Sequence, residues 1–82
     1  MNKKLFEVKY FGATNNRGSR IKIIDSCNGN SVIISYDYRY NNALDGAIAF
    51  LVEKKGIKKD DISYGELKNS YIIILNDFTI KL

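Results

Sequence analysis

Alternating apolar and polar positions in the first half of the chain predict three β-strands. In the first of them Phe6, Val8 and Tyr10 lie on one side and polar side chains on the other, the period of two expected of a half-buried strand. The segments with strand patterns are 4–11, 20–23 and 32–36. Asn28-Gly29 lies between the last two and is a strong hairpin signal. The first half is therefore predicted to be a three-stranded meander.

The period changes after residue 40 and predicts one helix over 41–55. Apolar residues recur there at helical spacing, at Leu44, Ala47, Ile48 and Leu51. Asn41 or Asn42 is suited to cap the start, and Gly56 to end the helix. Gly46 within the helix costs up to about 1 kcal/mol relative to alanine. Its presence suggests that another element packs closely against it.

The second half after the helix predicts a further hairpin, with strands at 64–67 and 71–75. Asn76-Asp77 then allows another reversal into 78–80, although a bulge in one longer strand fits equally well. The predicted fold is α+β: a four- to five-stranded, mainly antiparallel sheet with one amphipathic helix packed on one face, in the order β-β-β-α-β-β. With 82 residues the chain has room for one core, so we expect a single domain over 1–82.

Composition narrows the chemistry that the chain can perform. It has no histidine and one cysteine, which excludes an internal disulfide, Cys/His metal clusters, and the Ser-His and Cys-His nucleophile pairs. We therefore expect no enzyme and no cofactor. No apolar run approaches the roughly 20 residues that span a bilayer, and no signal-type stretch follows Met1, so a cytoplasmic location without membrane contact is expected.

The net charge of +4 is carried by the first half of the chain. Residues 1–40 hold seven of the 13 basic residues and three of the nine acidic ones, which leaves six of each in residues 41–82. A positive end that faces an anionic partner is one interpretation. The other is ordinary surface charge placed for solubility.

A polar loop between the first two predicted strands is the main candidate site. Its candidate residues are Thr14, Asn15, Asn16, Arg17, Ser19 and Arg20, with Gly18 among them. Guanidinium groups bind phosphate through two hydrogen bonds, hydroxyl and backbone N–H groups add donors, and glycine lets the backbone approach closely. The alternative is an ordinary connection whose Asn and Ser side chains bond to their own backbone.

A second cluster alternates aromatic and charged residues after the third predicted strand. It consists of Tyr36, Asp37, Tyr38, Arg39 and Tyr40. If the strand continues through it, the three tyrosines share one face. Exposed, they would stack on bases or contact a protein, with Arg39 near phosphates or an acidic partner. Buried, they are core and sheet-face residues that lead into the helix.

The segment from Tyr10 to Arg20, followed by Tyr36-Asp37-Tyr38 and an alanine-bearing helix, resembles a family of small proteins encoded by phages, plasmids and other mobile elements. The likeness covers the first half of the chain, and its most specific part is the motif Thr-Asn-x-Arg-Gly-Ser-Arg over residues 14–20. Family members carry Thr where Asn16 stands. The family has no established activity, so the resemblance implies a setting in a bacterial mobile element and assigns no residue a role.

These observations lead to two hypotheses. The first is a non-enzymatic protein that binds nucleic acid, or a complex that handles nucleic acid, through the loop 14–20, with Lys9 and Lys22 extending the positive strip and the tyrosines stacking on bases. The alternative is an anti-defence inhibitor, of the anti-CRISPR type, that binds a host protein through its tyrosine- and arginine-rich surface. An exposed edge strand at 78–82 could also pair two chains into a homodimer.

Overall fold

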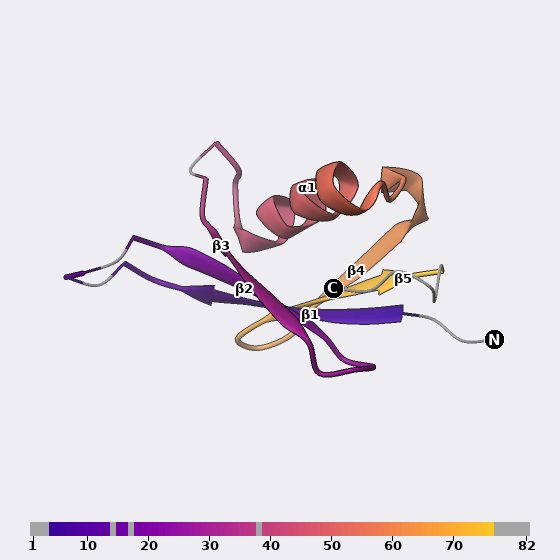
Figure 1. Ribbon diagram of the computed structural model, residues 1–82, viewed down its shortest axis with the longest axis horizontal. Coiled ribbons are helices and arrows are strands. Elements are labelled where there is room, and N and C mark those ends of the chain that lie inside the picture. The colour runs from indigo at the N-terminus through magenta and orange to yellow at the C-terminus, as the bar shows by residue number, and fades with distance from the viewer. Residues whose placement is uncertain (1–3, 14, 17, 38, 77–82) are drawn as a thin grey trace.

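The computed structural model describes residues 4–13, 15–16, 18–37 and 39–76. Five strands and one helix make up this part of the chain (Figure 1). The elements are β1 (Lys4–Phe11), β2 (Arg20–Asp25), β3 (Ser31–Ser35), α1 (Ala43–Lys55), a single 3-10 turn (Lys59–Asp61), β4 (Ile62–Glu66) and β5 (Tyr71–Leu75). No helix among these residues is long and apolar enough to cross a bilayer.

The strands form one antiparallel sheet in the order β3-β2-β1-β5-β4. Strand β1 lies in the middle and joins the meander β1-β2-β3 to the hairpin β4-β5. The helix packs against one face of the sheet, over β1 and β2 (Figure 1). The predicted α+β class and element order are therefore confirmed. The reversal or bulge after Asn76, and the edge strand at 78–82, lie outside the described residues.

The core lies between the sheet and α1. It consists of Phe6, Val8, Ile21, Ile23, Ala43, Leu44, Ala47, Leu51, Ile57, Ile73 and Leu75. The strand members of this set come from alternate positions, as the period of two requires. We call the face that carries them the helix face, and the opposite one the open face. Every residue that the sheet presents on the open face comes from the other alternate positions.

The ends of α1 follow from the local sequence. Asn42 is the N-cap, and its side-chain oxygen accepts a hydrogen bond of 2.9 Å from the backbone N–H of Asp45. Gly56 ends the helix in the left-handed conformation, with φ of 69°, and donates its N–H to the carbonyl of Leu51. Ile57 then turns back into the core. Asn42, and not Asn41, is thus the capping residue.

Gly46 lies where α1 approaches β2 most tightly. A Cβ placed there would be 2.8 Å from Cδ1 of Ile21, which is fully buried, so the Ile21 side chain would have to shift. The close packing that the sequence suggested is therefore present, and the glycine is needed for it.

We expect Gly46→Ala to lower the free energy of unfolding by about 1 kcal/mol, because the overpacking cost exceeds the gain in helix propensity. Urea unfolding followed by circular dichroism measures this change. Gly65→Ala is the matched control, since nothing lies within 4 Å of a Cβ at Gly65 and its φ is not positive. A stabilised Gly46→Ala variant would show that Ile21 can shift at no cost.

The turn between β2 and β3 is built on Asp25, which is fully buried. One carboxylate oxygen accepts a 2.9 Å hydrogen bond from the N–H of Cys27, and the other lies 2.8 Å from the ammonium of Lys4. The Lys4 side chain is 3% exposed, so this ion pair lies inside the core. Asp25 and Lys4 both belong to the helix face, next to Phe6, the direct partner of Asp25 across the ladder.

Candidate nucleic-acid interface

The open face of the sheet is not covered by α1 and divides into two halves. Cross-strand register places residues in rows across the strands. The two rows at one end are Ser35–Arg20–Phe11 and Ile33–Lys22–Lys9. The rows at the other end are Ser31–Ile24–Glu7–Ile72 and Leu5–Ile74. We call the first end the basic half and the second the apolar half.

The basic half lies where β1 and β2 run beyond the end of β5. Strand β5 pairs with β1 only as far as Val8, so Lys9 to Phe11 are paired with β2 alone. Figure 1 shows these two strands extending from the body of the sheet toward the loop between them. Lys9 and Phe11 therefore have no partner from β5 across the ladder.

Lys9 and Lys22 are direct partners across this ladder. Two ammonium groups directly opposite one another destabilise a sheet, because like charges repel and no side-chain attraction compensates. Neither lysine takes part in an ion pair among the described residues, where the two pairs are Lys4–Asp25 and Arg39–Asp37. Glu7, on the same face, accepts a hydrogen bond of 3.3 Å from the Ser70 hydroxyl. Among the described residues, the charges of Lys9 and Lys22 are therefore not neutralised by an ion pair.

Arg20 and Phe11 form the outer row of the basic half. The guanidinium carbon of Arg20 lies 5.7 Å from the centroid of the Phe11 ring, within the range of a cation–π contact. The Nε of Arg20 is buried and makes no hydrogen bond within the described structure. The Phe11 ring is 39% exposed. An aromatic ring and a guanidinium group are therefore held together at the surface.

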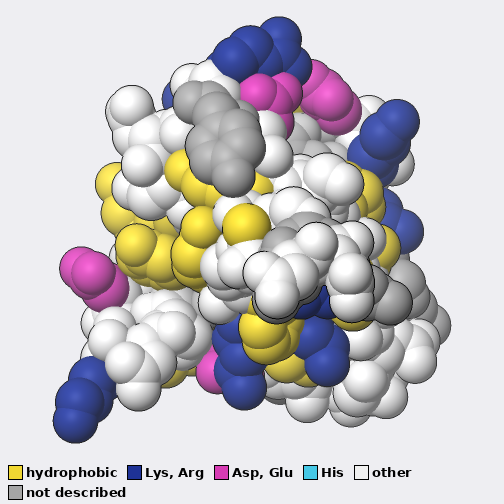
Figure 2. Space-filling view, turned by 90° about the vertical axis from the view of Figure 1, so that its left-hand side faces the viewer, with side chains coloured by type: hydrophobic (Ala, Val, Ile, Leu, Met, Phe, Trp, Pro, Cys, Tyr) yellow, Lys and Arg dark blue, Asp and Glu magenta, His cyan; other side chains and the backbone are white. Residues whose placement is uncertain are grey.

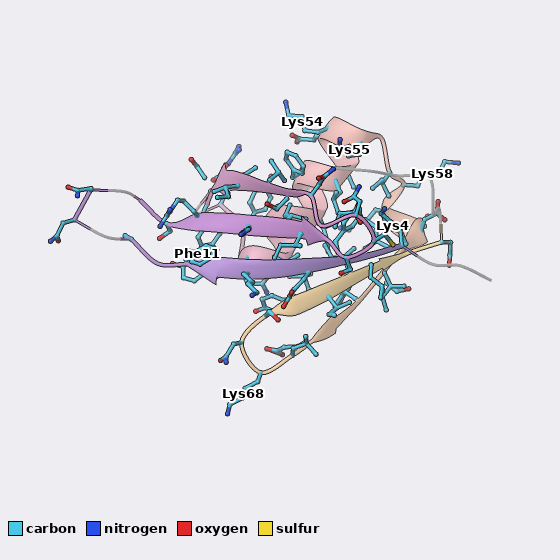
Figure 3. All side chains as sticks on the ribbon, turned by 60° about the horizontal axis from the view of Figure 1, so that its bottom comes forward. Lys4, Phe11, Lys54, Lys55, Lys58 and Lys68 are labelled. Atoms are coloured by element: carbon cyan, nitrogen blue, oxygen red, sulfur yellow. The ribbon has the colours of Figure 1, made fainter. Side chains whose placement is uncertain are left out.

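Figure 2 views the molecule from this end, and at its lower edge hydrophobic surface lies between Lys and Arg side chains. Figure 3 turns the open face forward and shows Phe11 at the end of β1 far from Lys4. Lys54 and Lys55 lie on the helix, on the other side of the sheet (Figure 3). The lysines of α1 are thus separated from the basic half by the sheet itself.

The apolar half of the open face carries four large aliphatic side chains. Leu5 is exposed, and Ile24, Ile72 and Ile74 are half-buried. Ile33, an apolar member of the basic half beside Lys22, is 54% exposed. The open face therefore offers apolar contact area adjoining a cluster of cations.

The loop before β2 is placed in part. Asn15, Asn16 and Gly18 are exposed, while Ser19 is buried and its hydroxyl accepts a hydrogen bond of 3.0 Å from Tyr10. Ser19 therefore supports the fold at this point. Thr14 and Arg17 lie outside the described residues, and their predicted role stays a prediction.

The tyrosine cluster does not continue the strand, because β3 ends at Ser35. Tyr36 lies on the helix-face side, where its ring packs edge-on against Tyr10 at 5.6 Å and its hydroxyl donates to the carbonyl of Tyr40. Tyr40 is half-buried, and Tyr38 lies outside the described residues. The structure thus places Tyr36 and Arg20 on opposite faces of the sheet, so they form no common platform.

Arg39 is held by its neighbour Asp37. Its Nε and one terminal nitrogen donate to the same carboxylate oxygen at 2.8 and 2.6 Å, and its backbone N–H donates to the other at 2.9 Å. These side-chain and backbone hydrogen bonds lower the pKa of Asp37, so the carboxylate stays ionised. Arg39 is therefore paired with a carboxylate, and its side chain is 83% exposed.

The helix side carries a hollow of about 430 Å³, lined in part by Arg39, Asp45, Ile48 and Glu53. Its arginine is already bound to Asp37, and two carboxylates face it. No group of three or more potential metal ligands occurs among the described residues. This hollow is a poorer site for an anion than the open face.

Sequence reasoning named Lys9, Arg20 and Lys22 but missed Phe11. The available signal was its place in the alternation, because Phe11 falls in the polar series with Glu7 and Lys9. Comparisons with models of protein families, with curated proteins and with solved structures find no match.

Proposed function

We propose that this chain is a non-enzymatic nucleic-acid-binding protein, and that it binds through the basic half of the open face. The observation that supports this most is the Lys9–Lys22 pair, two cations held opposite one another without an acidic partner in the described structure. Such a pair costs stability, and an anionic ligand such as a phosphate backbone would offset that cost. Arg20 adds a third cation in the next row.

The loop residues Asn15 and Asn16 extend this surface toward the 14–20 motif. They are exposed at the end of the β1-β2 hairpin, adjacent in sequence to the basic half. In the proposal they add hydrogen bonds to phosphate or sugar, which position the ligand and do not read its sequence. Arg17 would contribute a further phosphate contact.

The proposal predicts that Lys9→Gln/Lys22→Gln loses nucleic-acid affinity while it keeps or gains stability. Fluorescence anisotropy with labelled oligonucleotides at 50 and 200 mM salt measures the affinity, and urea unfolding measures the stability. Four phosphate contacts, from Lys9, Lys22, Arg20 and Arg17, give a log–log salt slope of about −3 on single strands, and the double variant retains about half of that slope. Loss of repulsion is expected to add a few tenths of a kcal/mol to stability.

Lys54→Gln/Lys55→Gln is the matched control, because it removes the same charge from the helix end. It should bind like the parent chain. Equal losses in both double variants would indicate a nonspecific effect of net charge. Absence of binding to any oligonucleotide at low salt would overturn the proposed function.

A protein partner is the second candidate, in keeping with an anti-defence inhibitor from a mobile element. The apolar side chains of the open face favour it, since exposed Leu5 in the apolar half and exposed Ile33 in the basic half resemble the apolar centre of a protein interface. Co-precipitation from a host lysate with and without nuclease distinguishes the two. A partner that is retained after nuclease treatment, and lost on Ile33→Glu, would favour this candidate.

A further inference from the structure

We infer that the ligand is a single strand of nucleic acid, and that one unpaired base stacks on Phe11 beside Arg20. This inference rests on the proposed function and specifies its substrate. The starting observation is that the open face combines cations with exposed apolar and aromatic surface. A surface that carries only positive charge binds any polyanion. An exposed aromatic ring in addition favours a ligand that has a flat apolar face.

A duplex presents phosphates on its outside and hides the faces of its bases in the stack. Against a duplex, the exposed Phe11 ring and Ile33 would gain little, because neither can reach a base face. A single strand presents phosphates on one side and base faces on the other. The phosphates of a single strand can contact the cations Lys9, Lys22 and Arg20. Its base faces can contact the exposed apolar side chains of Phe11 and Ile33.

The Phe11 ring lies beside the guanidinium group of Arg20. Arg20 lies directly opposite it in the ladder, and its guanidinium carbon is 5.7 Å from the ring centroid. A base placed against this pair contacts an aromatic ring and a cationic group together, and both contacts favour it whatever its identity. The Nε of Arg20 is buried and has no hydrogen-bond partner among the described residues, so no hydrogen bond to Nε is lost when the guanidinium group contacts a ligand.

The apolar half continues the same surface along the strands. Ile24 and Ile72 lie in the same row as Glu7, and Leu5 and Ile74 lie in the row beyond it. Further bases of the nucleic-acid strand would lie over these side chains. Aliphatic side chains contact the bases without forming hydrogen bonds to them, so they do not distinguish one base from another. Among the described residues of this face the uncharged polar side chains are serines, as at Ser31 and Ser35, so tolerance of sequence is expected.

The test compares a labelled 15-nucleotide dT strand, a 15-nucleotide rU strand and a 15-base-pair duplex at 50 mM salt. The parent chain is expected to bind the single strands at least about 10-fold more tightly than the duplex. Phe11→Ala should weaken single-strand binding by about 5- to 150-fold, the usual range for loss of one stacked base. It should leave duplex binding within about 2-fold. Far-UV circular dichroism and the unfolding midpoint establish that the variant is folded.

A second variant keeps the test decisive if Phe11→Ala does not fold. The chain has no tryptophan, so Phe11→Trp introduces a single emitting indole at the proposed stacking position. Its fluorescence should be quenched by the dT strand and not by the duplex. Tyr64→Trp is the control, because Tyr64 is 64% exposed on the helix-face side of β4. Its emission should not change.

The outcomes separate the two proposals. Tighter binding to single strands, with quenching of the Phe11→Trp variant, supports stacking on Phe11. Equal or tighter binding to the duplex, or unquenched emission from the Phe11→Trp variant while the strand is bound, overturns the stacking inference and leaves nucleic-acid binding intact. Failure of all three probes to bind overturns both.

Discussion

Asp25→Ala is expected to destabilise the protein by about 3 to 5 kcal/mol, the cost of leaving one charge of a buried ion pair without its partner. The Lys4 ammonium is 3% exposed and lies 2.8 Å from the Asp25 carboxylate. Without that carboxylate, the Lys4 ammonium loses its 2.8 Å contact in the core next to Phe6. The Cys27 N–H also loses its acceptor in the turn.

Urea unfolding followed by circular dichroism measures the effect, which is large compared with the roughly 5 to 15 kcal/mol that stabilises typical domains. Asp37→Ala is the matched control, since it breaks an ion pair that is exposed to solvent. Little change in stability is expected there, because exposed pairs contribute little. If Asp25→Ala and Asp37→Ala lower the free energy of unfolding by similar amounts, burial does not explain the effect of Asp25.

A double replacement distinguishes the contribution of the ion pair from the contribution of the Asp25 side chain to the turn. Lys4→Met/Asp25→Leu removes both charges and fills the space with apolar atoms, so it should recover most of the loss. The remaining difference from the parent chain should be about 1 kcal/mol, from the hydrogen bond to Cys27. If the double variant is as unstable as Asp25→Ala, the pair contributes nothing and the carboxylate acts through the turn alone.

The elements of this fold were predictable because each depends on local pattern. Alternation gave β1, and apolar spacing with Asn42 and Gly56 gave the helix that the structure has at Ala43–Lys55. The order of the strands was not predictable. Strand β1 pairs with β5, as in Val8 with Tyr71, and no short-range signal specifies a contact between residues so distant in the sequence.

The candidate site shows the same division. Alternation placed Phe11 and Lys9 on one side of the first strand, and Arg20 and Lys22 on one side of the second. These side chains share one face of the sheet because Phe11 pairs with Arg20 across the ladder. The loop between the two strands is long, so the sequence does not specify this register. The same holds for Lys4 and Asp25, both polar residues in otherwise apolar series.

The residues after Ser35 do not extend β3, and the reason is local. The third strand ends at Ser35, and the next residues form a turn in which the Tyr40 N–H donates to the carbonyl of Asp37. The Asp37 side chain also binds the Arg39 backbone. These local hydrogen bonds compete with extension of the strand, as aspartate commonly does at turns. The high β-propensity of tyrosine did not outweigh them.

Leu51→Ala is expected to cost about 3 kcal/mol, within the usual range for removing a large aliphatic side chain from a core. Leu51 is fully buried between α1 and the sheet, and its carbonyl accepts the N–H groups of Gly56 and Ile57 that end the helix. Thermal unfolding should show a midpoint lowered by more than about 10 °C, since about 1 kcal/mol shifts a domain of this size by roughly 4 to 8 °C. Val52→Ala, at a half-exposed position of the same helix, should change the midpoint little because alanine's helix propensity offsets the lost contact.

The same variant distinguishes the two faces of the sheet. Leu51 lies over the helix face, whereas Lys22 and Phe11 lie on the open face, so a folded Leu51→Ala chain should bind a single strand with the affinity of the parent. The measurement is made well below the lowered midpoint, where the variant is still folded. Retained affinity together with lost stability would place binding and core packing on separate surfaces. Lost affinity in a folded Leu51→Ala chain would mean that the ligand contacts the helix side, and the open face would cease to be the candidate site.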